Sequence, residues 1–389
     1  MTSTDSDFPL LVSEHDTWIS VEPLIGCPAK CGYCYLNQIG ITAQRPIIRA
    51  TVNNTLDALT SYLKTSTGGT RSDLTPVSIG NYTDMCMTET GRVYLEEFLR
   101  EYACRRINRV VCLVTKAKLA PTFLRTIAAC EVPIVFFLSQ SFGFESGTRL
   151  ELGAVSSPEQ TLQNAQLVSE QPNLSVVHFW RPFLAALNPL DKLVRRVEEL
   201  RSAGCQCSVV IGLKGEVTNA NLHGLIGATD RRTLSGDELF ANDMWNDLSQ
   251  IARDTGYPLF RHTSCAIALA RHEAEALGTW SASKAADKCI PCSCPAQQRS
   301  RCAMRRGEAK SSIALNALVA PELGSASWEL IDSIDGPAIK IEGSLNEFAY
   351  NRLHHIVGVP VITDGITRQK AWLGAFSSGS PLQTDSFND

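Results

Sequence analysis

The 389-residue sequence predicts an α/β protein built on a partial (β/α)6, TIM-like barrel, followed by a cysteine-rich segment and a small α/β appendage. Three observations predict this fold class. Short apolar, β-branched runs alternate with amphipathic helical stretches, which is the pattern of a parallel sheet. Near residue 281 the composition changes and cysteines crowd together. Beyond residue 309 a second, smaller set of strand and helix patterns begins.

Six apolar runs are the expected strands of the main part: 18–26, 76–80, 109–115, 132–139, 174–181 and 207–213. The helices between them carry terminal signals. Ser157, Pro158 and Gln160 have the pattern of an N-cap, a first helical proline and a capping box. Asn188-Pro189 is expected to open the next helix in the same way, and Gly204 to end it. A further helix is expected at 236–257, with a strand candidate at 258–264.

The predicted organisation has five parts. They are an N-terminal extension (1–17), the barrel (18–280), a four-cysteine segment (281–309), the appendage (310–375) and a disordered tail (376–389). Within the appendage, strands are expected near 338–343 and 358–363, around a helix at 345–357.

Charge and hydropathy narrow the class of protein. A net charge of −4 argues against a bulk nucleic-acid binder. The N-terminus lacks a basic start and a long apolar run, and no stretch of about 18 apolar residues occurs, so we expect a cytoplasmic protein without a membrane span. In that compartment, 14 cysteines are expected to be metal ligands or buried thiols and not disulfides.

Cys27, Cys31 and Cys34 lie in the stretch GCPAKCGYCYL, residues 26–36, with the spacing C-x3-C-x2-C. The stretch follows the first predicted strand, so it belongs at the C-terminal end of the barrel. Three thiolates suit a [4Fe–4S] cluster with one iron left open for another ligand. A two-cluster ferredoxin has a different spacing, and a structural zinc site takes four ligands.

A second group of cysteines lies C-terminal to the barrel, spaced x2, x1 and x7: Cys289, Cys292, Cys294 and Cys302. Four thiolates satisfy either a closed [4Fe–4S] cluster or one tetrahedral zinc ion, and both alternatives stay open.

The first cysteine stretch, with Tyr33 before its last cysteine, resembles the radical S-adenosylmethionine (SAM) superfamily. Residues 79–84, 114–117 and 149–165 are similar to segments of its spore photoproduct lyase-like branch. The resemblance implies an enzyme that reductively cleaves SAM to a 5′-deoxyadenosyl radical, which abstracts hydrogen from a substrate carbon. It also implies a flavodoxin- or ferredoxin-type electron donor. We expect a small-molecule substrate, with a peptide or nucleic acid held by the appendage as the alternative.

The resemblance implies SAM contacts from six residues: Asn81, Thr83, Asp84, Lys116, Arg149 and Glu151. Ser139, which ends an apolar strand run, is a further candidate for lining the cofactor pocket. Lys116 would meet the SAM carboxylate, although a solvated rim lysine is the alternative. Asp84 has an alternative role as a cap, and Arg149 with Glu151 as an ion pair.

Cys86, His178 and Arg181 are the catalytic candidates, although a lone histidine on a strand is more often a hydrogen-bonded core residue than a substrate contact. The lyase carries a cysteine just before its Ser-Asp pair, whereas here the nearest thiol, Cys86, follows Thr83-Asp84. This departure argues against repair of DNA photoproducts. Two functions of other classes remain, a two-cluster electron carrier and a zinc-bearing nucleic-acid-binding module, and SAM cleavage would separate the first of them from an enzyme.

Overall fold

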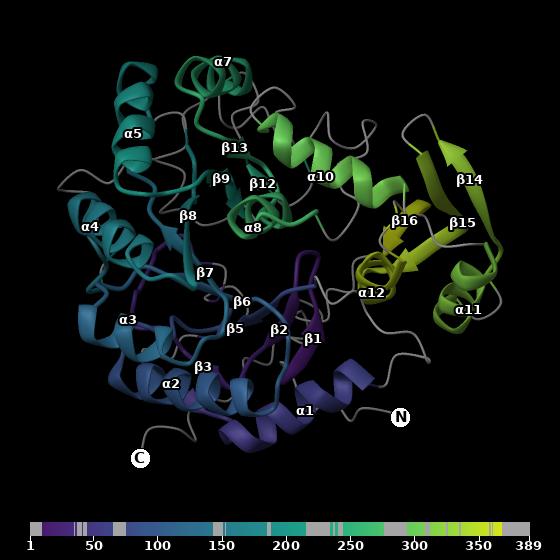
Figure 1. Ribbon diagram of the computed structural model, residues 1–389, viewed down its shortest axis with the longest axis horizontal. Coiled ribbons are helices and arrows are strands. Elements are labelled where there is room, and N and C mark those ends of the chain that lie inside the picture. The colour runs from purple at the N-terminus through teal and green to yellow at the C-terminus, as the bar shows by residue number, and fades with distance from the viewer. Residues whose placement is uncertain are drawn as a thin grey trace.

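An eight-stranded sheet forms the centre of the molecule in the computed structural model, in the order β1-β2-β5-β6-β7-β8-β9-β13 (Figure 1). The structure describes residues 10–34, 36, 41, 45–64, 75–142, 151, 153–184, 188–214, 234–235, 238–239, 244–275, 294–307, 312–323, 326–333, 336–357, 359 and 361–367. Arg149, Cys289, Cys292 and the predicted tail lie outside the described residues.

Seven of these strands run parallel, and β1 pairs antiparallel with β2 at one edge. The strands are β1 (Val12–Glu14), β2 (Ile19–Val21), β5 (Val77–Ile79), β6 (Val111–Thr115), β7 (Ile134–Ser139), β8 (Leu174–Trp180), β9 (Ser208–Val210) and β13 (Leu259–Phe260). All six runs predicted as strands are strands, and the candidate at 258–264 contains β13. Among the described residues no pairing joins β13 to β1, so the sheet is open. A mixed α/β fold with a largely parallel sheet is thus confirmed, whereas the described strands do not close into a barrel and the partial (β/α)6 barrel stays a prediction.

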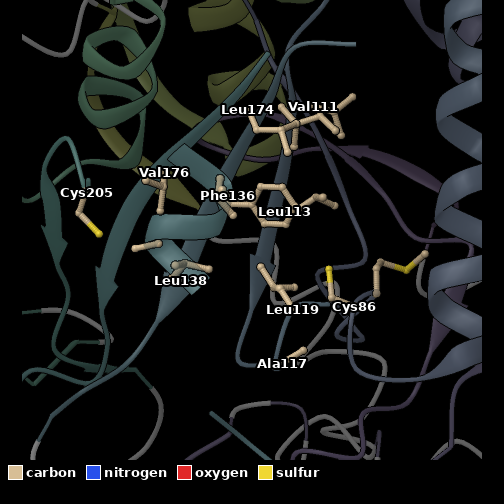
Figure 2. Close-up of a cluster of buried hydrophobic side chains, with 14 of the residues drawn as sticks. Cys86, Val111, Leu113, Ala117, Leu119, Phe136, Leu138, Leu174, Val176 and Cys205 are labelled. Atoms are coloured by element: carbon tan, nitrogen blue, oxygen red, sulfur yellow. The ribbon is translucent and has the colours of Figure 1, made fainter. Parts of the chain in front are cut away.

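Helices cover one face of the sheet (Figure 1). They are α1 (Val52–Lys64), α2 (Glu89–Cys104), α3 (Pro121–Ala128), α4 (Pro158–Ser169), α5 (Leu190–Ser202) and α7 (Trp245–Thr255). Alternate residues of each strand, such as Ile134, Phe136 and Leu138 of β7, join the apolar side chains of these helices in the larger core. Figure 2 shows Phe136 and Leu138 in this core.

The opposite face, called the inner face below, packs on α8 (Thr263–Arg271). Ala266, Ile267 and Ala270 of α8 belong to a second core that includes Phe137 of β7 and Phe179 of β8. Strand alternation therefore assigns every second residue to the inner face, and among the described helices α8 covers this face at β8, β9 and β13.

Sequence signals predicted the cap of α4 correctly and that of α5 incorrectly. Ser157 caps α4 and forms the full capping box with Gln160, as predicted. Asn188 does not cap α5: its amide donates to the Leu184 carbonyl and its oxygen accepts from the Trp180 indole, so Pro189 takes the cap position without a side-chain bond. The cause is a tertiary contact: the Trp180 indole occupies the Asn188 oxygen that would otherwise cap the helix.

The helix predicted at 236–257 is shorter than expected where it is described. Glu238–Leu239 form strand β12, and α7 begins only at Trp245. Strand β12 pairs with β10 (Leu213–Lys214) and β11 (Leu234–Ser235) in a small sheet. A two-residue strand has almost no sequence pattern of its own. The residues of β12 were therefore assigned to the helix predicted from the periodicity of 236–257.

The C-terminal part has a hydrophobic core of its own. Its sheet is β14 (Trp328–Ser333), β15 (Gly336–Asn346) and β16 (Val361–Thr367), with helices α11 (Ser312–Leu323) and α12 (Glu347–Val357). The strands and helix predicted here are present, while β14 and α11 were not predicted. Helix α10 (Ala296–Gly307) precedes this part (Figure 1). None of the described helices has the length and apolar character needed to cross a membrane.

Helix α12 packs on β1 through buried charged groups. Glu14 Oε2 lies 2.6 Å from His355 Nδ1, and both side chains are fully buried. Arg352 Nε lies 3.8 Å from Glu14 Oε1, and its Nη1 lies 3.3 Å from Glu322. Strand β1, within the predicted N-terminal extension, is therefore both a strand of the main sheet and the docking point of the C-terminal part.

Candidate active site

The cysteine loop, residues 26–34, follows β3 (Leu24–Ile25), which pairs with β4 (Ile47–Ile48). Its first residue, Gly26, is hydrogen-bonded through both its backbone N–H and its carbonyl. The Gly26 N–H donates to the Tyr82 carbonyl at 3.0 Å, and the Thr83 hydroxyl donates to the Gly26 carbonyl at 2.5 Å. Gly26 has φ +99°, a conformation that glycine adopts without steric cost. The loop after β5 thus fixes where the cysteine loop begins.

Glu151 and Gly153 hold the other side of the loop. Cys31 and Glu151 form an isolated antiparallel bridge, and the Gly153 N–H donates to the Ala29 carbonyl at 2.9 Å. A Cβ on Gly153 would lie 2.5 Å from the Ala29 carbonyl oxygen and closer still to that of Pro28. Only glycine allows this approach of two backbones.

Replacing Gly153 with alanine should therefore displace the cysteine loop. The contacted atoms are backbone carbonyls, which cannot rotate away, and overpacking of this kind costs about 1–3 kcal/mol. We expect a lower urea midpoint and less bound iron after anaerobic purification. Wild-type iron content together with a wild-type midpoint would show that the two backbones do not need this contact.

The three thiols lie close enough to affect one another's ionisation. Burial raises the pKa of Cys27 and Cys31 to about 12, and the neighbouring thiols add to the increase in each. Burial also raises the pKa of Cys34, while Arg181 and Lys116 oppose that rise. The thiols are thus protonated on their own, and binding of a metal group would release those protons. In the part of the chain that the structure describes, no three His, Cys, Asp or Glu side chains form a ready site for a metal ion.

Lys116 lies beside the cysteine loop, directly after β6. Its Nζ lies 2.7 Å from Glu151 Oε1 and donates to the Ser139 carbonyl at 3.2 Å. The Lys116 side chain is 13% exposed and that of Glu151 8%. The Tyr33 hydroxyl donates to the same Glu151 oxygen, and Lys116 Nζ lies 5.7 Å from the Tyr33 ring centroid. Tyr33, Lys116 and Glu151 therefore form one partly buried group that includes a residue of the cysteine loop.

Asp84 anchors the backbone that carries Lys116. Its carboxylate accepts from the Thr115 hydroxyl at 2.8 Å, from Lys116 N at 2.7 Å and from Cys86 N at 3.0 Å. Burial raises the Asp84 pKa, and these donors oppose the rise. The carboxylate is thus committed to contacts within the protein, and its predicted contact with SAM stays a prediction.

Asn81 and Thr83 also use their side chains within the protein. The Asn81 amide donates to Glu22 Oε1 at 2.6 Å and to Ser20 Oγ at 3.0 Å, while its oxygen accepts from Ser78 Oγ at 3.0 Å. Thr83 binds Gly26 as described above. Residues 81–84 therefore connect the cysteine loop, β2 and β6.

The remaining predicted residues divide between the two faces of the sheet. Strand alternation assigns Ser139 and Arg181 to the inner face, and Arg181 Cζ lies 5.8 Å from the Phe179 ring centroid. Cys86, in contrast, is 1% exposed in the helix-covered core, where Figure 2 shows it near Leu119. Lys116, Ser139 and Arg181 thus share an edge with the cysteine loop, and Cys86 faces apolar side chains.

His178 lies on the helix-covered face with both ring nitrogens bonded. Its Nε2–H donates to the Gln140 carbonyl at 2.8 Å, since a carbonyl only accepts, and Nδ1 accepts from Ser208 Oγ at 3.0 Å. The Ser208 Oγ in turn lies 3.0 Å from the Tyr257 hydroxyl. Burial lowers the His178 pKa to about 3, so the ring is neutral near pH 7. These contacts match the core alternative for His178.

Glu22, which sequence reasoning did not select, is a buried carboxyl at the C-terminal end of β2. Its position within an apolar strand run was the available signal, because an acid there needs polar partners. Burial raises its pKa to about 8, although bonds from Asn81 and Tyr82 oppose the rise.

This raised pKa predicts the sign of a pH effect. An acid whose pKa is raised in the folded state retains its proton where the unfolded chain has lost it, so stability falls as pH rises from about 4.5 to about 8. Glu22→Gln removes the titration. We expect the urea stability of this variant relative to wild type to increase over that range. A constant difference between the two proteins would contradict the assignment.

Only part of the second cysteine group is described. Cys294 packs against the inner-face core that contains Cys207. Cys302, on α10, is 8% exposed, and its Sγ accepts from Glu275 N at 3.4 Å and from Gln298 Nε2 at 3.5 Å. Cys289 and Cys292 lie outside the described residues.

Comparisons with known proteins give structural matches alone. No family model and no curated protein matches the chain. A variant of spore photoproduct lyase matches with TM-score 0.45 and 12% identity, over 60% of this chain and 72% of that one. A second variant, with AdoMet and dinucleoside spore photoproduct bound, matches with TM-score 0.45 and 12% identity, over 61% and 72%.

The radical S-adenosylmethionine methyltransferase TsrM from Kitasatospora setae matches with TM-score 0.37 and 12% identity, over 50% of this chain and 36% of that one. These TM-scores describe a partial overlap of fold.

Proposed function

We propose that this protein is a radical SAM enzyme, in which Cys27, Cys31 and Cys34 hold three irons of a [4Fe–4S] cluster and the fourth iron binds SAM. The observation that carries the proposal is the cysteine loop itself. Three thiols lie within eight residues at the edge of a parallel sheet, and their loop is anchored to residues 82–83, to Glu151 and to Gly153.

The donor set fits a cluster. In a [4Fe–4S] cluster each thiolate binds a different iron, so the three thiols need not converge on one point. Cys27 and Cys34 are half-buried, whereas Cys31 is buried at the bridge to Glu151. Lys116 favours the thiolate of Cys31, and Arg181 that of Cys34. When bound, the cluster would supply one electron to the SAM sulfonium, and the resulting 5′-deoxyadenosyl radical would take hydrogen from a substrate carbon.

The chain's own residues would bind SAM and orient it beside the cysteine loop. The Lys116 ammonium is the group suited to the SAM carboxylate, because charge-assisted bonds from lysine to a carboxylate are strong. Glu151 and the Ser139 carbonyl already hold Lys116 beside the cysteine loop. Apolar side chains of the inner face, such as Phe137 and Phe179, exclude water from the part of the sheet next to Lys116 and the cysteine loop.

The reaction requires an external low-potential electron donor of the flavodoxin or ferredoxin type, and we propose a small-molecule substrate. For the cysteines at 289–302 we propose a second [4Fe–4S] cluster, with structural zinc as the alternative.

The decisive test is SAM cleavage. Protein purified without oxygen is mixed with SAM and dithionite, and 5′-deoxyadenosine and methionine are quantified by chromatography. We expect both products in equal amounts, and none without reductant. Iron-loaded protein that forms neither product would contradict the proposed function and favour an electron carrier.

A further inference from the structure

Glu22 is a carboxyl with a defined set of contacts at the edge of the sheet where the cysteine loop begins. The residue is 1% exposed. Oε1 accepts from Asn81 Nδ2 at 2.6 Å, and Oε2 accepts from the Tyr82 backbone N–H at 3.1 Å. Each carboxyl oxygen therefore holds one residue of the loop that follows β5.

The Asn81 amide is itself fixed in orientation. Ser78 Oγ donates to its oxygen, and its nitrogen donates to Ser20 Oγ as well as to Glu22. Ser20 lies on β2 and Ser78 on β5. The amide thus bridges two neighbouring strands and presents its N–H to Glu22.

A short path leads from Glu22 to the first cysteine. Tyr82, whose N–H binds Glu22, accepts from the Gly26 N–H through its own carbonyl. Thr83 holds the Gly26 carbonyl. Because Cys27 follows Gly26 directly, a shift of residues 82–83 moves the start of the cysteine loop.

The same segment holds Lys116 at its other end. Asp84 accepts from the Lys116 N–H and from the Thr115 hydroxyl. Residues 81–84 therefore link the cysteines on one side to Lys116 on the other. Glu22 holds the cysteine side of this link, and Asp84 holds the lysine side.

We infer that Glu22 is a positioning residue, which sets the distance and orientation of the cysteine loop relative to Lys116. The inference rests on the proposed function, because a ligand that bridges the open iron and Lys116 needs both in register. A bulky apolar residue could fill the space without the cost of burying a carboxyl. An apolar residue, however, could not accept the two hydrogen bonds by which Glu22 connects β2 to residues 81 and 82.

The test compares Glu22→Gln with a matched control, Glu14→Gln. Glu14 is also a buried acid, on the neighbouring strand β1, but it binds His355 and not the loop after β5. Glutamine at position 22 keeps the volume but offers one acceptor oxygen to two donors. Iron content, the SAM dissociation constant and the electron paramagnetic resonance spectrum of the reduced cluster, with and without SAM, are measured for each variant.

We expect Glu22→Gln to retain wild-type iron and to bind SAM about tenfold more weakly, equivalent to about 1.4 kcal/mol. The spectral change on adding SAM should be smaller than in wild type. Glu14→Gln should match wild type in all three measurements. Ser78→Ala, which releases the Asn81 oxygen, should weaken SAM binding in the same direction and decides the question if Glu22→Gln does not fold.

Wild-type SAM affinity and spectra in Glu22→Gln and Ser78→Ala would overturn the inference. Loss of iron from folded Glu22→Gln would also overturn it, since Glu22 would then be needed for cluster assembly and not for orientation. Failure of the proposed function looks different, because wild-type protein would then bind no iron or cleave no SAM.

Discussion

Replacing Cys31 with alanine is expected to abolish iron binding at the cysteine loop. Cys31 is the buried thiol of the three and lies at the bridge to Glu151, and two thiols do not retain a cluster that needs three. We expect a loss of about four irons and an equal number of sulfides per chain. Iron, sulfide and zinc are measured in protein purified without oxygen. SAM cleavage should fall to background.

Cys205→Ala is the matched control for this loss. Cys205 is 4% exposed in the helix-covered core, where it also appears in Figure 2, and it belongs to neither predicted metal site. Unchanged iron in the control and reduced iron in Cys31→Ala assign the cluster to the loop. Equal iron in Cys31→Ala and wild type would remove the basis of the proposed function.

The residual metal in Cys31→Ala also characterises the second cysteine group. About four remaining irons would support a second cluster, and one zinc without iron would support a structural zinc site.

Replacing Lys116 with methionine is expected to destabilise the protein and to prevent SAM cleavage. The substitution leaves Glu151, whose side chain is 8% exposed, without its cation. Breaking a buried ion pair in this way costs about 3–5 kcal/mol. Urea unfolding measures the loss of stability, and 5′-deoxyadenosine formation measures the loss of activity.

A second substitution separates these two effects. In Lys116→Met combined with Glu151→Gln no uncompensated charge remains, so we expect stability to recover in part while SAM cleavage stays absent. Lys340→Met is the control, because its pair with Glu329 is exposed and should contribute little. Activity retained by the double variant would show that Lys116 only neutralises Glu151.

Local pattern was enough for the parallel strands of the main sheet, whereas the antiparallel edge strand β1 was not predicted. Each predicted strand run, such as 132–139, is rich in apolar residues, many of them β-branched or aromatic, because a parallel strand is buried on both faces. The cap of α4 was predictable for a similar reason, since Ser157 and Gln160 bond each other within one turn. Strand β14 was missed because its sequence, WELIDS, does not alternate regularly between apolar and polar residues: the pairs Leu330-Ile331 and Asp332-Ser333 interrupt the period of two that predicts a half-buried strand.

The contacts of the site could not be predicted from local pattern. The cysteine spacing is a local signal, but Tyr33 and Glu151 are 118 residues apart, and Asn81 meets Glu22 across 59 residues. Asn81, Thr83 and Asp84 were selected as cofactor contacts, whereas their side chains bind protein groups. A motif fixes which residues occur together, and the sheet determines whether a polar side chain faces a ligand or a neighbouring strand.

The contact between β1 and α12 has a consequence for biosynthesis. Glu14 and His355 are separated by 341 positions, so β1 is synthesised long before its partner helix. Until α12 arrives, β1 lacks the helix that packs on it, and the Glu14 carboxyl lacks its histidine partner. Unprotected edge strands favour association with other chains. The C-terminal part therefore acts as a late cover for the newly made sheet, and its docking completes folding of the N-terminal edge.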